Sequence, residues 1–422
     1  MRKRKRIYDS VHRFIHVDEL ENALINTRPF QRLHYIHQLG VTYLVYPGGT
    51  HRRFAHSLGV MEIATRIYDT VTQPNKLHKL SGLMPEYGSP EHRYWRRVLR
   101  LASLCHDIGH LPFSHVAESK LIGTKGHEVW TRKILESEAF DSIWEQFHGE
   151  SLSDGINRDV RGDVMYVALG EKNFKEKFTP WEYIVTEIIT GDFFGADRID
   201  YLLRDSQCTG LSYGVFDYHQ LIEMLKIIVT KEGSLTLGIE ENGMDSYESL
   251  MLARHYMHKR LYQYPNVKAY AYHLVCFMEK SYCDIGKNLN HYISITDNEV
   301  LAELNRASGD ETRPGHVDAQ YLCLRRDPFR AIPFTSRPDR GLLLAVKERL
   351  KDKIDWELCK NGGQRVKPSF PVLKRDGSVD IGENLSELTV AHTDRSWVYV
   401  APQYEEEIRR IFSPCSESCP SN

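Results

Sequence analysis

The side chains best able to do chemistry gather in residues 99–116 of this 422-residue chain, LRLASLCHDIGHLPFSHV. His106 and Asp107 are adjacent, and His110 and His115 follow closely. Adjacent residues do not share one helix face, yet both reach one ion where a helix ends around them. Imidazole together with carboxylate suits Mn, Fe, Ni or Zn, and a metal held this way turns water into a nucleophile near neutral pH. Because 20 His produce such a pair by chance, the apolar lead-in and the two later His are what favour a metal site.

A second group of polar side chains lies along a predicted helix near residues 197–205. Its members share one helical face, namely Asp197, Asp200, Tyr201, Arg204 and Asp205. Carboxylates at this spacing suit a metal, but a solvated helix face has the same pattern. The spacing alone leaves both interpretations open.

A third group lies on a predicted helix of about residues 245–264. Arg254, His258 and Tyr262 follow one another at spacing four, with Lys259 and Gln263 beside them. Basic and aromatic side chains on one face fit contacts to phosphate and base. A solvated basic face is the competing interpretation, and it stays open.

The elements that must position these groups are mostly helical. Helical patterns are predicted over residues 18–26, 29–39, 56–69, 99–105, 126–135, 297–306, 342–350 and 405–412. Strand-like stretches cover 41–46, 233–242, 329–334, 370–373 and 397–401, and residues 149–180 suggest a turn-rich surface excursion. The chain is therefore expected to be mostly α, with an α+β texture after about residue 285.

Composition excludes several classes of protein. The net charge is −2 with 27% charged residues, so the overall charge gives no reason to expect binding to nucleic acid or to a membrane. The five consecutive cations of Arg2–Arg6 are the local exception. Eight scattered Cys contain no CxxC pair, which argues against a zinc ribbon and a disulfide scaffold. No apolar run approaches 18 residues. We expect a soluble, cytoplasmic protein with no membrane partner.

Taken together, these segments resemble the deoxynucleoside triphosphate triphosphohydrolase branch of the HD-domain phosphohydrolase superfamily, over roughly residues 8–280. The pattern of that family is a first His, a His-Asp pair and a distant Asp. It is matched by His56 in RRFAHSLGV, by His106-Asp107 in CHDIGHLPFSH and by Asp197 in GADRIDYLLRD. Several motifs in family order are far more specific than any one of them.

The resemblance implies a helical bundle in which His56, His106, Asp107 and Asp197 hold one divalent transition metal, with positions left open for water and substrate. It also implies that His127 protonates the departing 5′ oxygen while its neighbour Glu128 orients it. His110 belongs with this catalytic group. Mg²⁺ is a further expected ion, carried by the triphosphate.

Other positions match residues that surround the substrate in the family. Those around the triphosphate are Arg53, His110, His115, Arg198, Tyr201 and Arg254, with Arg198 standing where the family commonly has Lys. Gln38, Leu39 and Asp205 match contacts to the sugar, Asp205 as acceptor for the 3′-hydroxyl. Tyr262 matches the aromatic that packs on the sugar and crowds out a 2′-hydroxyl, with His258 and Gln263 near it.

The resemblance further implies a homo-oligomer, often a tetramer, and an activating nucleotide. Vertebrate members build a guanine-nucleotide regulatory site with an acidic residue where this chain has Asn26 and an Arg where it has His34. A carboxamide does not copy the way a carboxylate reads the guanine N–H groups. GTP activation of that kind is therefore not expected, while another activator or none stays open.

The expected domains are an HD-domain phosphohydrolase core over residues 1–284 and an α+β region over 285–422 that serves packing or oligomerisation. The leading hypothesis is hydrolysis of dNTPs to deoxynucleoside and tripolyphosphate. One alternative is an HD hydrolase of another phosphoester, such as a nucleoside monophosphate, an alarmone or an oligonucleotide. Another is a nucleotide- or nucleic-acid-binding regulator with little turnover, for which the basic start is the best support.

Overall fold

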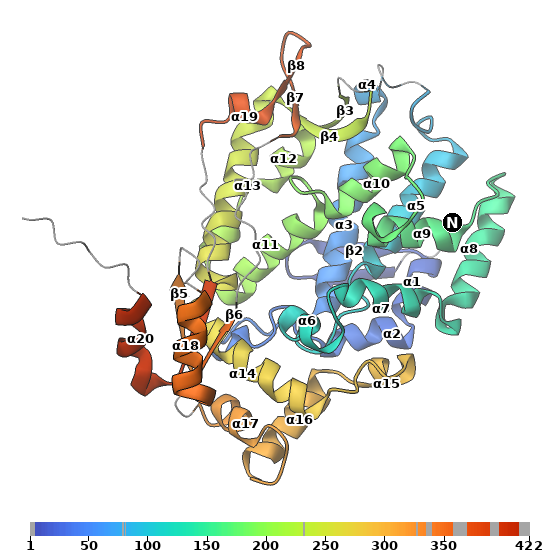
Figure 1. Cartoon of the computed structure of the whole chain (residues 1–422). Coiled ribbons are helices and arrows are strands. Elements are labelled where there is room, and N and C mark those ends of the chain that lie inside the picture. Colours follow the sequence, from blue (N-terminus) through green and yellow to red (C-terminus); the bar gives the residue numbers. More distant parts are fainter. Residues whose placement is uncertain are drawn as a thin grey trace, which may run out of the picture.

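The computed structural model describes residues 5–77, 80, 82–230, 233–325, 328–334, 340–357, 369–388 and 396–412. Within these ranges the chain is mostly helical, with three small sheets (Figure 1), as the sequence predicts. Most of the basic start, residues 1–4, lies outside the described residues, as do Cys359, Cys415 and Cys419. No helix among the described residues combines the length and the apolar character needed to cross a bilayer.

The first two thirds of the chain form a bundle of helices. Its members are α1 (Glu19–Ile25), α2 (Arg28–Gln31), α3 (Arg53–Val71), α4 (Pro74–Leu77), α5 (Pro90–Cys105), α6 (Glu118–Leu121), α7 (Gly126–Leu135), α8 (Asp141–Ser153), α9 (Val160–Leu169), α10 (Pro180–Thr190), α11 (Ala196–Thr209), α12 (Tyr218–Met224), α13 (Met244–Met257) and α14 (Pro265–Ser281). Figure 1 shows α3 in the middle of this bundle.

The central helix α3 is buried on almost every side. It packs against α5 and α11, and its apolar residues Val60, Ile63 and Ile67 are fully buried. Its polar residues Glu62, Arg66 and Asp69 are only partly buried, and they mark the side of the helix that faces away from the core. Helix α5 runs beside it, begins after the N-cap Ser89 with Pro90 in its first turn, and ends at Cys105, with His106 as its C-cap. The ends of α3, α5 and α11 therefore converge on one place.

The strands form three sheets. Strands β1 (Lys5–Asp9) and β2 (Arg13–Val17) pair as an antiparallel hairpin that the sequence did not predict. Strands β3 (Leu225–Val229) and β4 (Leu235–Glu240) pair antiparallel, which confirms the strand expected within 233–242. Strand β7 (Pro371–Leu373) joins β4 in parallel and carries β8 (Val379–Ile381), so a late segment completes a sheet on the helical bundle (Figure 1).

The remaining segments form the α+β region that the sequence predicts. Helices α15 (Leu289–Ser294), α16 (Asp297–Ser308) and α17 (His316–Cys323) follow α14, with α17 packed against both α14 and α16. The third sheet has the order β5 (Arg330–Phe334), β9 (Ser396–Val400), β6 (Ile354–Glu357). Helices α18 (Arg340–Leu350) and α20 (Glu405–Phe412) cover that sheet with a small apolar core. Helix α19 (Gly382–Leu385) follows β8. The division at residue 284 stays a prediction.

Three expectations about local structure are wrong in whole or in part. The helix predicted over residues 29–39 is confirmed only as far as Tyr35, since Ile36 is extended and His37 forms a bridge with Arg52. Residues 41–46 are a 3₁₀ turn, Thr42–Leu44, because Gly40 adopts φ +55° and the amides of Thr42 and Tyr46 bond to nearby carbonyls rather than to a strand. The stretch 149–180 is not a surface excursion, since α9 packs its Val side chains between α5 and α10. The charged residues on either side of α9 made this stretch look like a surface loop, although it contains a short apolar helix that begins after the N-cap Asp159.

Candidate metal centre and adjoining pocket

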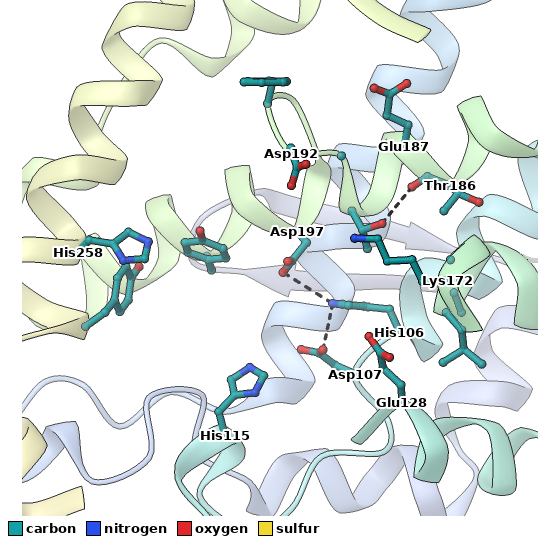
Figure 2. Close-up of a pocket in the computed structure, with 18 of the residues that line it drawn as sticks. His106, Asp107, His115, Glu128, Lys172, Thr186, Glu187, Asp192, Asp197 and His258 are labelled. Carbon is teal, nitrogen blue, oxygen red and sulfur yellow. Dashed lines mark hydrogen bonds and ion pairs between the residues drawn. The ribbon is translucent and has the colours of Figure 1, made fainter. Parts of the chain in front are cut away.

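Two imidazoles and two carboxylates meet where α3, α5 and α11 converge. Nε2 of His56 lies 3.0 Å from Asp197 and 3.5 Å from Asp107. Nε2 of His106 lies 3.4 Å from Asp107 and 3.7 Å from Asp197. Figure 2 shows His106 and Asp107, at the end of α5, pointing toward Asp197 of α11. The structure thus brings together the four residues proposed from the sequence as metal ligands.

The outer nitrogens of both imidazoles are occupied. Nδ1 of His56 lies 2.7 Å from Asp200, and Nδ1 of His106 lies 2.8 Å from the carbonyl of Ser103. Both partners are acceptors, so in the neutral, metal-binding form of each ring the hydrogen sits on Nδ1 and Nε2 carries the lone pair. The two Nε2 atoms are buried with no hydrogen-bond partner. Unpaired nitrogen donors facing two carboxylates are what a divalent transition metal requires, so these residues fit such an ion.

The charges around the centre favour a cation. Burial lowers the pKa of His56, but Asp197 and Asp200 outweigh burial and raise that pKa to about 10, so without a metal a proton on Nε2 supplies the positive charge that a bound cation would replace. Burial raises the pKa of Asp107, but Arg53, His106 and His110 hold it well below its usual range. Both Asp107 and Asp197 are therefore ionised, and their combined charge attracts a positive group between them.

A second cluster of imidazoles surrounds the carboxylate of Glu118, in α6. Its Oε atoms lie 2.7 Å from Nδ1 of His110, 3.1 Å from Nδ1 of His115 and 3.1 Å from Nδ1 of His127. The rings of His110 and His127 stack at 3.7 Å. Burial raises the pKa of Glu118, but the three imidazoles outweigh it and lower that pKa far below its usual range. The carboxylate in contact with His127 is thus Glu118, while Glu128 lines the pocket nearby (Figure 2).

The turn that links these two clusters has an unusual backbone. Phe113 and Ser114 are consecutive residues with φ of 57° and 63°. These angles lie in the left-handed region of backbone conformation, which residues other than glycine rarely adopt. Such residues cost on the order of 1–3 kcal/mol each and persist where surrounding contacts fix them. Arg53 is one of these contacts, since its Nε lies 2.7 Å from Oγ of Ser114 and its guanidinium pairs with Asp107.

One large cavity, of about 1290 Å³, opens beside the metal centre. Most of the candidate residues line it, namely Gln38, Leu39, Arg53, His106, Asp107, His115, His127, Glu128, Asp197, Tyr201, Asp205, His258, Tyr262 and Gln263. His56 and His110 are buried behind its wall. Arg198 and Arg254 are not among the residues that line it. The functional roles of all these residues stay predictions.

Two aromatic side chains and one carboxylate form the wall opposite the His cluster. The hydroxyl of Tyr262 donates to Asp205 at 2.7 Å, and its ring lies edge-on to that of Tyr201. The second oxygen of Asp205 lies 2.7 Å from Nε2 of His51. In this state Asp205 thus has protein partners on both oxygens, and a sugar hydroxyl would have to share or displace one of them.

Arg198 and Arg254 carry unsatisfied guanidinium nitrogens. Nε of each is buried with no hydrogen-bond partner. Burial and the nearby charge of Arg198 lower the pKa of Arg254. Two half-buried cations close to one another are stabilised by an anion that pairs with both.

Sequence reasoning missed two residues that hold the site. Asp200 was noted within the polar stripe of α11 but given no role, although its burial at the centre separates it from a solvated face. Glu118 was not singled out, even though it lies three residues after His115, a spacing that brings the two side chains together on one turn. Glu187 was also missed. It lines the cavity, where burial raises its carboxyl pKa to about 7.

Comparisons with known proteins agree with this geometry. A protein-family model described as HD domain matches residues 53–166. An uncharacterized protein of Methanocaldococcus jannaschii is 37% identical over 266 residues, which are 63% of this chain and 47% of that protein. Deoxynucleoside triphosphate triphosphohydrolase SAMHD1 of Gallus gallus is 28% identical over 418 residues, 88% of this chain and 62% of that protein.

A solved structure resembles the whole chain. The crystal structure of a hypothetical protein from Aquifex aeolicus has a TM-score of 0.72 at 28% identity and covers 97% of this chain and 100% of its own. By contrast, the chain spans about half the length of the first curated relatives it matches, 47% and 51%.

Proposed function

We propose that this chain, whose residues 53–166 match the HD-domain family, is a metal-dependent phosphohydrolase that converts dNTPs to deoxynucleoside and tripolyphosphate. The observation that carries the proposal is the convergence of His56, His106, Asp107 and Asp197, with both Nε2 atoms unpaired, beside a cavity large enough for a nucleotide. The likeness to the SAMHD1 triphosphohydrolase supports the choice of substrate.

The four ligands would hold a divalent ion such as Mn, Fe, Ni or Zn, which when bound supplies an activated water for attack on the α-phosphorus. Arg198 and Arg254 bind and neutralise the triphosphate, which satisfies the two guanidinium groups that lack partners at Nε. Tyr201, which lines the cavity, positions the chain of phosphates. Mg²⁺ accompanies the triphosphate.

The leaving group of this reaction is the 5′ oxygen of the sugar. The bond between the α-phosphorus and that oxygen breaks, and the oxygen takes a proton from His127. Glu118 supports this role because it holds the His127 ring in place through Nδ1, which leaves the other ring nitrogen free to deliver a proton. The side chain of His127 is about one-fifth exposed, so it is accessible from the cavity.

Further features follow from the same proposal. Tyr262 packs on the sugar and excludes a 2′-hydroxyl, and Gln263 contacts the base. The active form is a homo-oligomer, with a tetramer as the expected size, and a nucleotide other than GTP is the proposed activator where one is needed. The proposed compartment is the cytoplasm, since scattered cysteines without pairs are typical of a reducing environment.

Product analysis tests the proposal. The purified protein is incubated with Mn or Mg and each dNTP, singly and mixed, and nucleoside, nucleotide and tripolyphosphate are separated. Deoxynucleoside together with tripolyphosphate is the expected result, and turnover of mixtures alone adds nucleotide activation. Release of orthophosphate from a dNTP, or cleavage of a nucleoside monophosphate, an alarmone or an oligonucleotide instead of a dNTP, would show that the enzyme hydrolyses a different phosphoester bond. No turnover, together with salt-dependent binding of single-stranded nucleic acid, would assign a binding regulator.

A further inference from the structure

The strained turn at Phe113 and Ser114 is held from outside the HD domain. A short segment at the junction of α15 and α16, residues 292–297, contacts residues 109–113 at several points. The hydroxyl of Tyr292 donates to the carbonyl of Gly109. Arg32 joins the two segments, since its guanidinium donates both to the carbonyl of Ile295, at 3.0 Å, and to that of His110, at 2.8 Å.

Asp297 is the charged member of this segment and is fully buried. One carboxylate oxygen accepts the backbone N–H of Phe113 at 2.7 Å. The other accepts the backbone N–H of His37 at 2.7 Å and lies against Nδ1 of the same residue. Arg52 supplies the nearby positive charge at 3.7 Å. A buried carboxylate with this many donors ties two loops that lie far apart in the sequence.

Both loops lead directly to the site. The residue after His37 is Gln38, which lines the cavity, and the carbonyl of His37 accepts the hydroxyl of Ser114 at 2.6 Å. The same hydroxyl oxygen accepts from Arg53, whose guanidinium pairs with the metal-ligand candidate Asp107. Continuous hydrogen bonds therefore connect Asp297 with the metal centre, and the next residue along the turn is His115.

We propose that Asp297 is a positioning residue of this active site: it fixes the left-handed turn at Phe113–Ser114 so that Arg53 and His115 face the cavity. The turn is strained, and a strained backbone keeps its shape only while its contacts hold it. Region 285–422 therefore contributes to the site as well as to packing. The catalytic part of this proposal rests on the proposed function, while the structural part does not.

The structural part is tested by hydrogen exchange. In Asp297→Ala, amides in a peptide covering residues 108–117 are expected to exchange at least about tenfold faster, because the Phe113 N–H loses its acceptor and the turn relaxes. Asp297→Asn keeps one oxygen for Phe113 and is expected to be intermediate. Asp318→Asn is the matched control, since Asp318 is a buried acid of the same region that pairs with His273 and Lys280 instead. Unchanged exchange in Asp297→Ala would overturn the proposal.

The catalytic part is tested on the full-length protein with its metal. In Asp297→Ala, kcat is expected to fall about 10–100-fold with KM and metal content within about twofold, since misplaced groups reduce rate more than binding. The less disruptive Asp297→Asn is expected to recover part of the loss, and Asp318→Asn to match the wild type. Wild-type kcat in Asp297→Ala, or an equal loss in Asp318→Asn, would overturn the positioning role. A wild-type protein without hydrolase activity would overturn the proposed function instead, and the exchange result would still decide the structural part.

Discussion

Asp200 fixes the orientation of His56. Its carboxylate lies 2.7 Å from Nδ1 of His56, and both side chains are fully buried. Because a carboxylate accepts only, the neutral ring that binds a metal carries its hydrogen on Nδ1 and directs the lone pair of Nε2 at the centre. Arg204 pairs with the same carboxylate at 2.9 Å and keeps it ionised, since Arg204 and two imidazoles outweigh burial and hold the pKa of Asp200 well below its usual range. Asp200 thus controls how His56 presents its metal-binding atom, Nε2.

Replacing Asp200 is therefore expected to weaken the metal site without touching a ligand. In Asp200→Asn, His56 loses the negative charge that raises its basicity, and affinity for Mn²⁺ should fall about 10–100-fold. Calorimetric titration with Mn²⁺, after removal of bound metal, measures this.

Asp9→Asn is the control for that experiment. Asp9 also pairs with Arg204, at 2.8 Å, so its substitution disturbs the same buried cation but leaves the contact between His56 and Asp200. Equal losses of Mn²⁺ affinity in the two variants would contradict a specific role for Asp200.

Much of this fold could be predicted because local patterns and tertiary structure agree. Helix α20 was predicted over the residues it occupies, and Thr296 with Glu299 caps α16 as a capping box. The hairpin of β1 and β2 could not be predicted, because its strands contain too few apolar residues to show a clear alternation of buried and exposed positions. Its stability comes instead from packing against the helical bundle. Strand β7 lies within the stretch 370–373 that was predicted as strand-like, but its parallel pairing with β4 could not be predicted, because only the fold brings these two distant segments together.

Some residues of the candidate site could be predicted from the sequence and others could not. His56, His106, Asp107 and Asp197 belong to motifs whose order identifies a family, so these four distant positions can be grouped from the sequence alone. Glu118 belongs to no such motif: its spacing predicts the contact with His115, but only the fold brings it within 3.1 Å of His127. Supporting contacts of this kind depend on tertiary geometry and leave little trace in the spacing of residues.

Substitution of His127 should separate catalysis from binding. In His127→Ala, turnover is expected to fall ~10²–10⁴-fold while metal and nucleotide still bind, because only the proton donor is lost. Asp107→Ala should instead release the metal. Metal content by mass spectrometry and steady-state kinetics distinguish the two effects, and near-normal turnover in His127→Ala would remove that residue from the role of general acid.

Tyr262 should control discrimination between deoxyribose and ribose. Its ring is held by the bond from its hydroxyl to Asp205 and by edge contact with Tyr201. Tyr262→Ala opens the space for a 2′-hydroxyl, so the ratio of kcat/KM for dNTP to that for rNTP should fall by about tenfold or more. Tyr262→Phe keeps the ring and should keep most of the discrimination. An unchanged ratio in Tyr262→Ala would place the sugar elsewhere in the cavity.

Arg254 should bind the triphosphate product as well as the substrate. Its Nε is buried without a partner beside Arg198, so an anion relieves an unfavourable arrangement. In Arg254→Ala, affinity for inorganic tripolyphosphate should fall about 10–100-fold. Lys259→Ala, which removes an exposed cation a few residues away, serves as control in the same calorimetric titration. An equal loss in the control would indicate a diffuse charge effect.

His51 should make stability depend on pH on the alkaline side. Burial lowers the pKa of His51, but Asp205 and Cys208 outweigh burial and raise it to about 9 from an ordinary value of 6.5. A group whose pKa is raised by folding stabilises the protein fully below the unfolded pKa and loses that contribution as the pH rises through the folded one. About 3 kcal/mol of unfolding free energy should therefore be lost between about pH 6.5 and 9.5. His51→Gln still donates to Asp205 but does not titrate, so denaturant unfolding at several pH values should show a flatter dependence for the variant than for the wild type. Parallel curves would mean that His51 does not carry its charge in the folded protein.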